Sequence, residues 1–231
     1  MRRASAFCFL LSAFVATSAC AVAAPLKHPV VVWTDEAHAQ PYFVEDSAID
    51  LLPPAAREEI TSALVTARKQ EEEFANTARA NGLNVSRCGP ETVGDSLTSA
   101  NAVDVLRSLP IVASGRIVDV VTGWNVPRHR VSSLVFVRVE EVWKGGGVAA
   151  DDILIVELPF GTFHHRGATW CTEMTGSDRM IPGRPILISG RLEPKRTPLT
   201  LLGTAWPIEN DHALPPHASP IALHTLRNSI R

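Results

Sequence analysis

The sequence has little net charge and, after its N-terminal segment, no long apolar run. Lysine and arginine number 22 against 24 aspartate and glutamate residues, which gives a formal net charge of −2. This balance excludes the basic field that attracts nucleic acid to a protein. No later stretch approaches the roughly 18 apolar residues of a transmembrane helix, so we expect no membrane span. The hydrophobic share of 45% and the charged share of 20% are typical of a folded globular chain.

The common catalytic motifs are also absent. The sequence has no G-x-S-x-G nucleophile elbow, no H-E-x-x-H zinc motif, no phosphate-binding P-loop and no Rossmann glycine pattern. We therefore expect a non-enzymatic protein without a cofactor.

The N-terminus has the three parts of a secretory signal peptide. Arg2 and Arg3 are followed by an apolar core over residues 6–16 and by an A-x-A site that ends at Ala23. We expect residues 1–23 to be removed and the protein to be secreted or periplasmic. An alternative is a lipoprotein signal at residues 17–20, with a lipid anchor on Cys20 and the protein as a component of the cell envelope.

Two cysteines, Cys88 and Cys171, follow the predicted signal peptide. In an oxidising compartment two thiols suggest one disulfide, which we value at about 4 kcal/mol from the loop it would close. The alternatives are two unpaired buried thiols, or a redox or nucleophilic cysteine. No C-x-x-C motif accompanies either residue, which argues against redox catalysis.

The spacing of apolar residues divides the remaining chain in two. Residues 24–109 predict a lead-in and a helical segment that packs on the following domain. A long helix begins near Pro53 and Pro54 and ends before Asn81 and Gly82. Its apolar positions fall on one face: Ile60, Leu64, Ala67, Phe74 and Ala78. A short helix is expected over residues 100–109.

Residues 110–231 predict a second, mainly β domain. Alternating apolar residues indicate strands over 111–121, 132–143, 152–158, 185–192 and 199–205, and a final helix over 218–230. The segment 160–171 is expected to be a loop. Five short strands with glycine between and within them favour a small closed or nearly closed barrel. The expected fold is therefore mainly β with α.

Several phrases of this β half occur in a recognisable order. They are the strand IVASGRIVDV with Gly115 inside it, the turn VEEVWKG that ends at Gly145, the strand DILIV from Asp152, Cys171 before a strand that begins near Pro185, and the tail Leu202-Gly203 with Trp206-Pro207. In this order they resemble the netrin-like and TIMP-like (tissue inhibitor of metalloproteinases) OB-barrel family with its bacterial exported members, over about residues 111–210.

The resemblance implies an OB-like barrel with a binding surface, and it does not extend to protease inhibition. The inhibitors chelate the zinc of the protease through an N-terminal cysteine in a C-x-C arrangement, and this sequence contains no C-x-C. We therefore expect an exported interaction domain whose partner is an unknown protein or glycan.

Two segments supply candidate ligand contacts. The five tryptophans are mostly expected in the core. Trp124 is the best candidate for an exposed one, because it stands beside Arg128, His129 and Arg130 in a predicted loop, and these four residues form a candidate ligand surface. His164 and His165 form the second segment and suggest an alternative, a zinc-dependent hydrolase with a distant third ligand. Adjacent histidines on a strand point to opposite faces, however, which argues against a shared ion.

Overall fold

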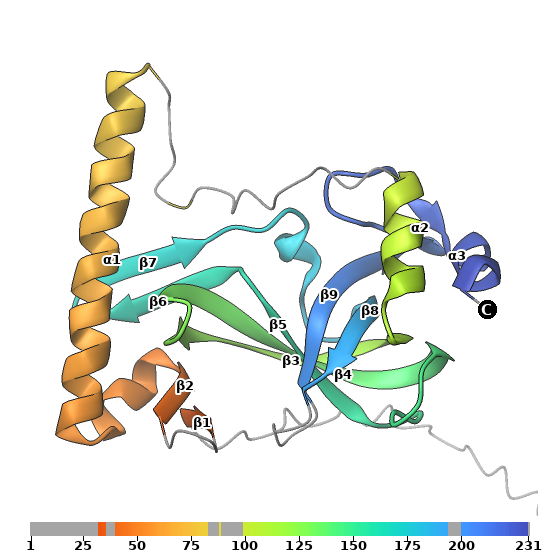
Figure 1. Cartoon of the computed structure of the whole chain (residues 1–231), viewed down its shortest axis with the longest axis horizontal. Coiled ribbons are helices and arrows are strands. Elements are labelled where there is room, and N and C mark those ends of the chain that lie inside the picture. Colours follow the sequence, from red (N-terminus) through yellow and green to blue (C-terminus); the bar gives the residue numbers. More distant parts are fainter. Residues whose placement is uncertain (1–31, 36–39, 83–87, 89–98, 194–199, 231) are drawn as a thin grey trace, which may run out of the picture.

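The computed structural model describes residues 32–35, 40–82, 88, 99–193 and 200–230 (Figure 1). The predicted signal peptide and Cys20 lie outside the described residues. The strands are β1 (Val32–Asp35), β2 (Gln40–Val44), β3 (Ile111–Asn125), β4 (Arg130–Lys144), β5 (Ile153–Leu158), β6 (Gly161–His165), β7 (Ala168–Thr172), β8 (Pro185–Leu192), β9 (Thr200–Glu209), β10 (His212–Ala213) and β11 (Ile221–Ala222). The helices are η1 (Asp46–Leu51), α1 (Pro54–Ala80), α2 (Ser99–Ser108), η2 (Ser177–Arg179) and α3 (Leu223–Ile230).

Five strands form a closed ring of hydrogen-bonded pairs. β3 pairs with β4, β4 with β5, β5 with β9, β9 with β8, and β8 returns to β3. All pairs are antiparallel except β5 with β9. These five strands are the ones that the alternation of apolar residues predicts. The longest of them, β3 and β4, extend past their predicted ends and form one hairpin.

One buried apolar cluster draws side chains from all five strands of the ring. On β4 it includes Val135, Val137 and Val139, the alternating positions of that strand. The ring therefore encloses the main core. Gly115 is needed here, as the sequence predicted for a bulged strand, because the register of β3 shifts beside it and a Cβ at Gly115 would lie 2.1 Å from the carbonyl oxygen of Arg138.

The ring is capped at its two ends by different helices (Figure 1). At one end α2 and α3 pack over Trp143 and Trp206 in a second buried cluster. Arg227 of α3 forms an ion pair with Glu141 of β4, and its guanidinium lies 5.1 Å from the Trp143 ring centroid. At the other end stand α1, η1 and the β6–β7 hairpin. We call this second end the hairpin end.

The long helix α1 matches its predicted limits within one residue. Ile60, Leu64 and Ala67 pack into the cluster at the hairpin end, and Ala78 is buried. Phe74 is on the same helical face but is 64% exposed. The helix runs past the hairpin on which its first half packs (Figure 1), and Phe74, in the second half, is not part of that cluster.

Two further expectations concern the segment 160–171 and a membrane span. The prediction of a loop over residues 160–171 is wrong, because this segment forms β6 and most of β7, paired from Gly161 with Thr172 to His165 with Ala168. Among the described helices, none has the length and hydropathy that a membrane crossing requires.

Candidate functional site

The hairpin end brings together the two predicted candidate segments. The ring of Phe163 on β6 lies between two tryptophans, with centroids 6.1 Å from Trp124 of β3 and 6.2 Å from Trp170 of β7. Trp124 is therefore core, with 1% of its surface exposed. The expectation that Trp124 forms part of an exposed ligand surface is wrong, because Phe163 and α1 cover it.

The two histidines of β6 have opposite environments, as alternation on a strand requires. His164 is exposed, and its Nδ1 lies 3.1 Å from the hydroxyl of Thr169. His165 is 9% exposed, and its Nε2 has no hydrogen-bond partner within the described part of the chain. Burial lowers the pKa of His165, and the neighbouring charge of Arg166 lowers it further, against the weaker opposing effect of Asp50 and Asp46.

The geometry gives no support to a shared zinc ion on this pair. His164 and His165 point to different sides of the hairpin. Among residues 32–35, 40–82, 88, 99–193 and 200–230, no group of three or more histidine, cysteine, aspartate or glutamate side chains is placed to hold a metal.

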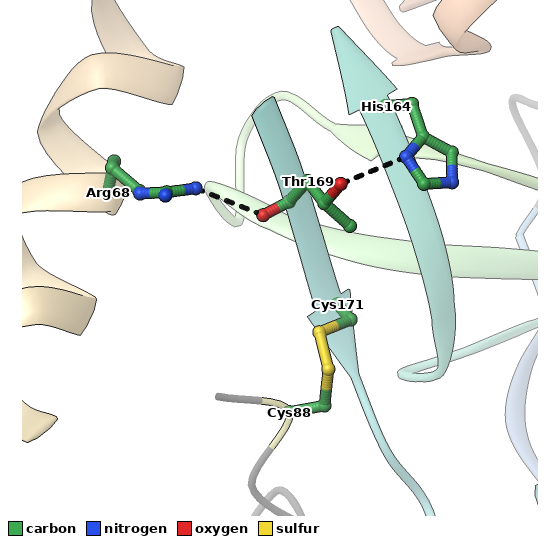
Figure 2. The surroundings of a disulfide bond; sticks show 5 residues. All are labelled: Arg68, Cys88, His164, Thr169 and Cys171. Atoms are coloured by element: carbon green, nitrogen blue, oxygen red, sulfur yellow. Dashed lines mark hydrogen bonds between the residues drawn. A yellow bond between two sulfur atoms is a disulfide. The ribbon is translucent and has the colours of Figure 1, made fainter. Parts of the chain in front are cut away.

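Cys171 of β7 lies at disulfide distance from Cys88, with Cα atoms 5.1 Å apart (Figure 2). Next to this pair, Thr169 links two neighbours. Its carbonyl oxygen accepts a hydrogen bond from Arg68 of α1 at 3.2 Å, while its hydroxyl contacts His164 of β6. The hairpin is thus linked to Arg68 of α1 and to Cys88.

The tip of the β3–β4 hairpin carries the predicted basic residues. Arg128 is 48% exposed, and its guanidinium lies 4.0 Å from the Glu157 carboxylate, which is 3% exposed. The side-chain amide of Asn125 donates a hydrogen bond to that carboxylate. His129 is exposed, and Arg130 is half-buried at the start of β4. Arg128 therefore covers a buried acidic group, and only part of its charge faces solvent.

A groove that the sequence does not predict lies between α1 and the β6–β7 turn. Its volume is about 540 Å³, and its lining comes from the first half of α1 and from Arg166 in the β6–β7 turn. The polar lining residues are Arg57, Glu58, Thr61, Ser62, Thr66 and Arg166. The lining also includes the apolar side chains of Pro54 and Val65. The groove is therefore suited to hold a partly anionic ligand that also has apolar parts, because it combines these side chains with two guanidinium groups, three hydroxyl-bearing residues and one carboxylate.

Arg57 is already positioned by the chain. Its Nη2 donates to the carbonyl oxygens of Asp50 at 2.7 Å and Leu52 at 3.1 Å, which fixes the junction between η1 and α1. Both acceptors are neutral, so the positive charge of Arg57 is retained next to the groove.

The sequence contained one signal for this groove. Arg166 and Gly167 form a two-residue turn in which both residues have positive φ; glycine is a usual second residue of such turns, whereas arginine is not a usual first residue. The polar face of α1 did not indicate a groove, because a hydrophilic helix face usually contacts only solvent. Comparison of the chain with protein-family models, with curated proteins and with solved structures found no match.

Proposed function

We propose that this chain is an exported, non-enzymatic binding domain that contacts its ligand in the groove between α1 and the β6–β7 turn. The observation that carries the proposal is the groove itself. It places two arginines and the exposed residues Ser62 and Thr66 along one groove, at an end whose core is packed with aromatic side chains. Binding sites of this kind gain affinity because little conformational freedom is lost when the ligand binds.

The strand ring supports the finer proposal that the domain is an OB-type barrel. Five strands close on themselves through antiparallel pairs and one parallel pair, which fits a small Greek-key barrel. In OB barrels the connection between the first two strands contributes to binding. Here that connection is the tip of the β3–β4 hairpin, at the same end of the ring as the groove (Figure 1).

Export is supported by the cysteines and by the N-terminal pattern. A cysteine pair at disulfide distance persists in oxidising compartments and is rare in the cytosol. The netrin-like and TIMP-like resemblance points to the same class of extracellular domain, and we propose kinship with its bacterial members without their inhibitory chemistry.

The test is a screen of the purified protein against a peptide library and a glycan array, with a variant that fills the groove. Ser62→Trp adds a large side chain at an exposed lining position of α1. Asn76→Trp is the matched control, since Asn76 is also exposed on α1 but lies about 21 Å further along the helix.

We expect ligands that bind the native protein and Asn76→Trp equally, and Ser62→Trp at least about tenfold more weakly. Circular dichroism and thermal unfolding check that both variants fold. The proposal is wrong if no peptide or glycan binds, or if every ligand that binds ignores the Ser62→Trp substitution.

A further inference from the structure

Arg166 occupies a backbone conformation that suits other residues better. Its φ is +47°, and with Gly167 at φ +76° it forms the two-residue loop between His165 and Ala168. Such loops favour asparagine or glycine at the first position, because a larger side chain with a Cβ is strained in the left-handed region. Strained positions persist where the surrounding structure or a function requires them.

The side chain of Arg166 has no structural task that would explain this choice. Among the described residues, its guanidinium makes no hydrogen bond and no ion pair, while it lines the groove opposite α1. An arginine fork in this state is free to bind a planar anion through two parallel hydrogen bonds.

The remaining lining specifies the rest of the ligand. Thr66 donates its hydroxyl to the carbonyl of Ser62 and keeps its oxygen lone pairs for a donor. The hydroxyl oxygen of Thr61 is buried without a partner within the described chain, and Glu58 adds a carboxylate acceptor. These acceptors match the N–H groups of a peptide backbone.

We propose that the groove binds an acidic peptide segment of a partner protein, with a ligand carboxylate held by Arg166 beside Arg57. This inference rests on the proposed function and names the ligand class for the same groove. A peptide is favoured over a glycan, because no lining side chain is aromatic and the groove has no ring on which a sugar could stack.

The structure offers a variant that removes the charge without harming the turn. Arg166→Asn places the residue that this turn prefers, so we expect the unfolding midpoint to stay equal or rise. His217→Asn is the control: His217 also has a left-handed backbone, with φ +59°, and lies outside the groove lining.

The probes are a synthetic peptide in which glutamate alternates with serine, the same peptide with glutamine for glutamate, and an oligogalacturonate as an acidic glycan. Both peptides have blocked termini, and binding is measured by isothermal titration calorimetry. We expect the glutamate peptide to bind the native protein and His217→Asn alike. Its affinity should fall at least about tenfold for Arg166→Asn, and about tenfold for the glutamine peptide.

The inference is overturned if the glutamate peptide does not bind, if the two peptides bind equally, if Arg166→Asn binds like the native protein, or if only the oligogalacturonate binds. Its failure is separable from that of the proposed function. Neutral ligands that depend on an open groove at Ser62 would preserve the binding function while they refute the carboxylate contact. An absence of any ligand that Ser62→Trp blocks would refute both.

Discussion

Loss of the Cys88–Cys171 link should remove a large part of the stability of this protein. The two cysteines are 83 residues apart in the sequence, so a bond between them closes a loop that contains α2 and most of the ring. In the chain-entropy model, a loop of this length corresponds to about 4 kcal/mol of stabilisation. This value is close to the total stability of many domains.

The effect is measured by urea unfolding of the native protein with and without a thiol reductant. With an unfolding slope of about 2 kcal/mol per molar urea, the midpoint should fall by about 2 M on reduction. Cys88→Ser combined with Cys171→Ser should show the low midpoint in both conditions. A peptide map under non-reducing conditions should contain the two cysteines in one cross-linked peptide.

Two results would refute this reasoning. A native midpoint that reductant leaves unchanged would mean that the two thiols are not bonded in the purified protein. The second result is a disulfide that is present but whose removal lowers the free energy of unfolding by less than about 1 kcal/mol. The unfolded chain would then keep residual structure that already holds the two cysteines near each other, contrary to the entropy model.

Two more predictions concern His165 and Gly203. Because burial lowers the pKa of His165 in the folded state, the unfolded chain binds more protons below about pH 6.5, and stability should fall as the pH drops from that value towards the folded pKa. Urea midpoints between about pH 7.5 and 5.5 should therefore decline more for the native protein than for His165→Gln, and parallel declines would contradict this. At Gly203 a Cβ would lie 1.8 Å from the carbonyl oxygen of Ser189, so Gly203→Ala should separate β8 from β9 and destabilise the fold by about 3 kcal/mol or more. Gly146→Ala, where a Cβ meets nothing within 4 Å, should leave the thermal midpoint nearly unchanged, and equal effects of the two alanines would count against this reading of the ring.

The elements with regular periodicity could be predicted from the sequence, and those defined by tertiary contact could not. The apolar period of α1 and the alternation of β4 depend only on neighbours along the chain. Trp124 was misjudged because its covering residue, Phe163, belongs to a hairpin that the sequence did not reveal. That hairpin is five residues to a strand, and its turn contains arginine where asparagine is the familiar signal.

The candidate site was predicted only in part for the same reason. His164 and His165 on β6 and Arg128 and His129 at the tip of the β3–β4 hairpin lie on elements of the hairpin end, and whether they contact a ligand stays a prediction. The groove forms because α1 lies next to the β6–β7 turn, which is about a hundred residues later in the chain. Local sequence patterns do not predict a contact between segments so far apart.

The ring has a consequence for the order in which the molecule assembles. Its first strand, β3, needs β8 as its second neighbour, and β5 needs β9, the last strand of the ring. β3 therefore keeps an unsatisfied edge until β8 has been synthesised, and β5 keeps one until β9 has been synthesised, and such edges are open to other chains. Such long-range pairing makes folding slow, and nascent chains that stop before residue 209 should be the form that aggregates.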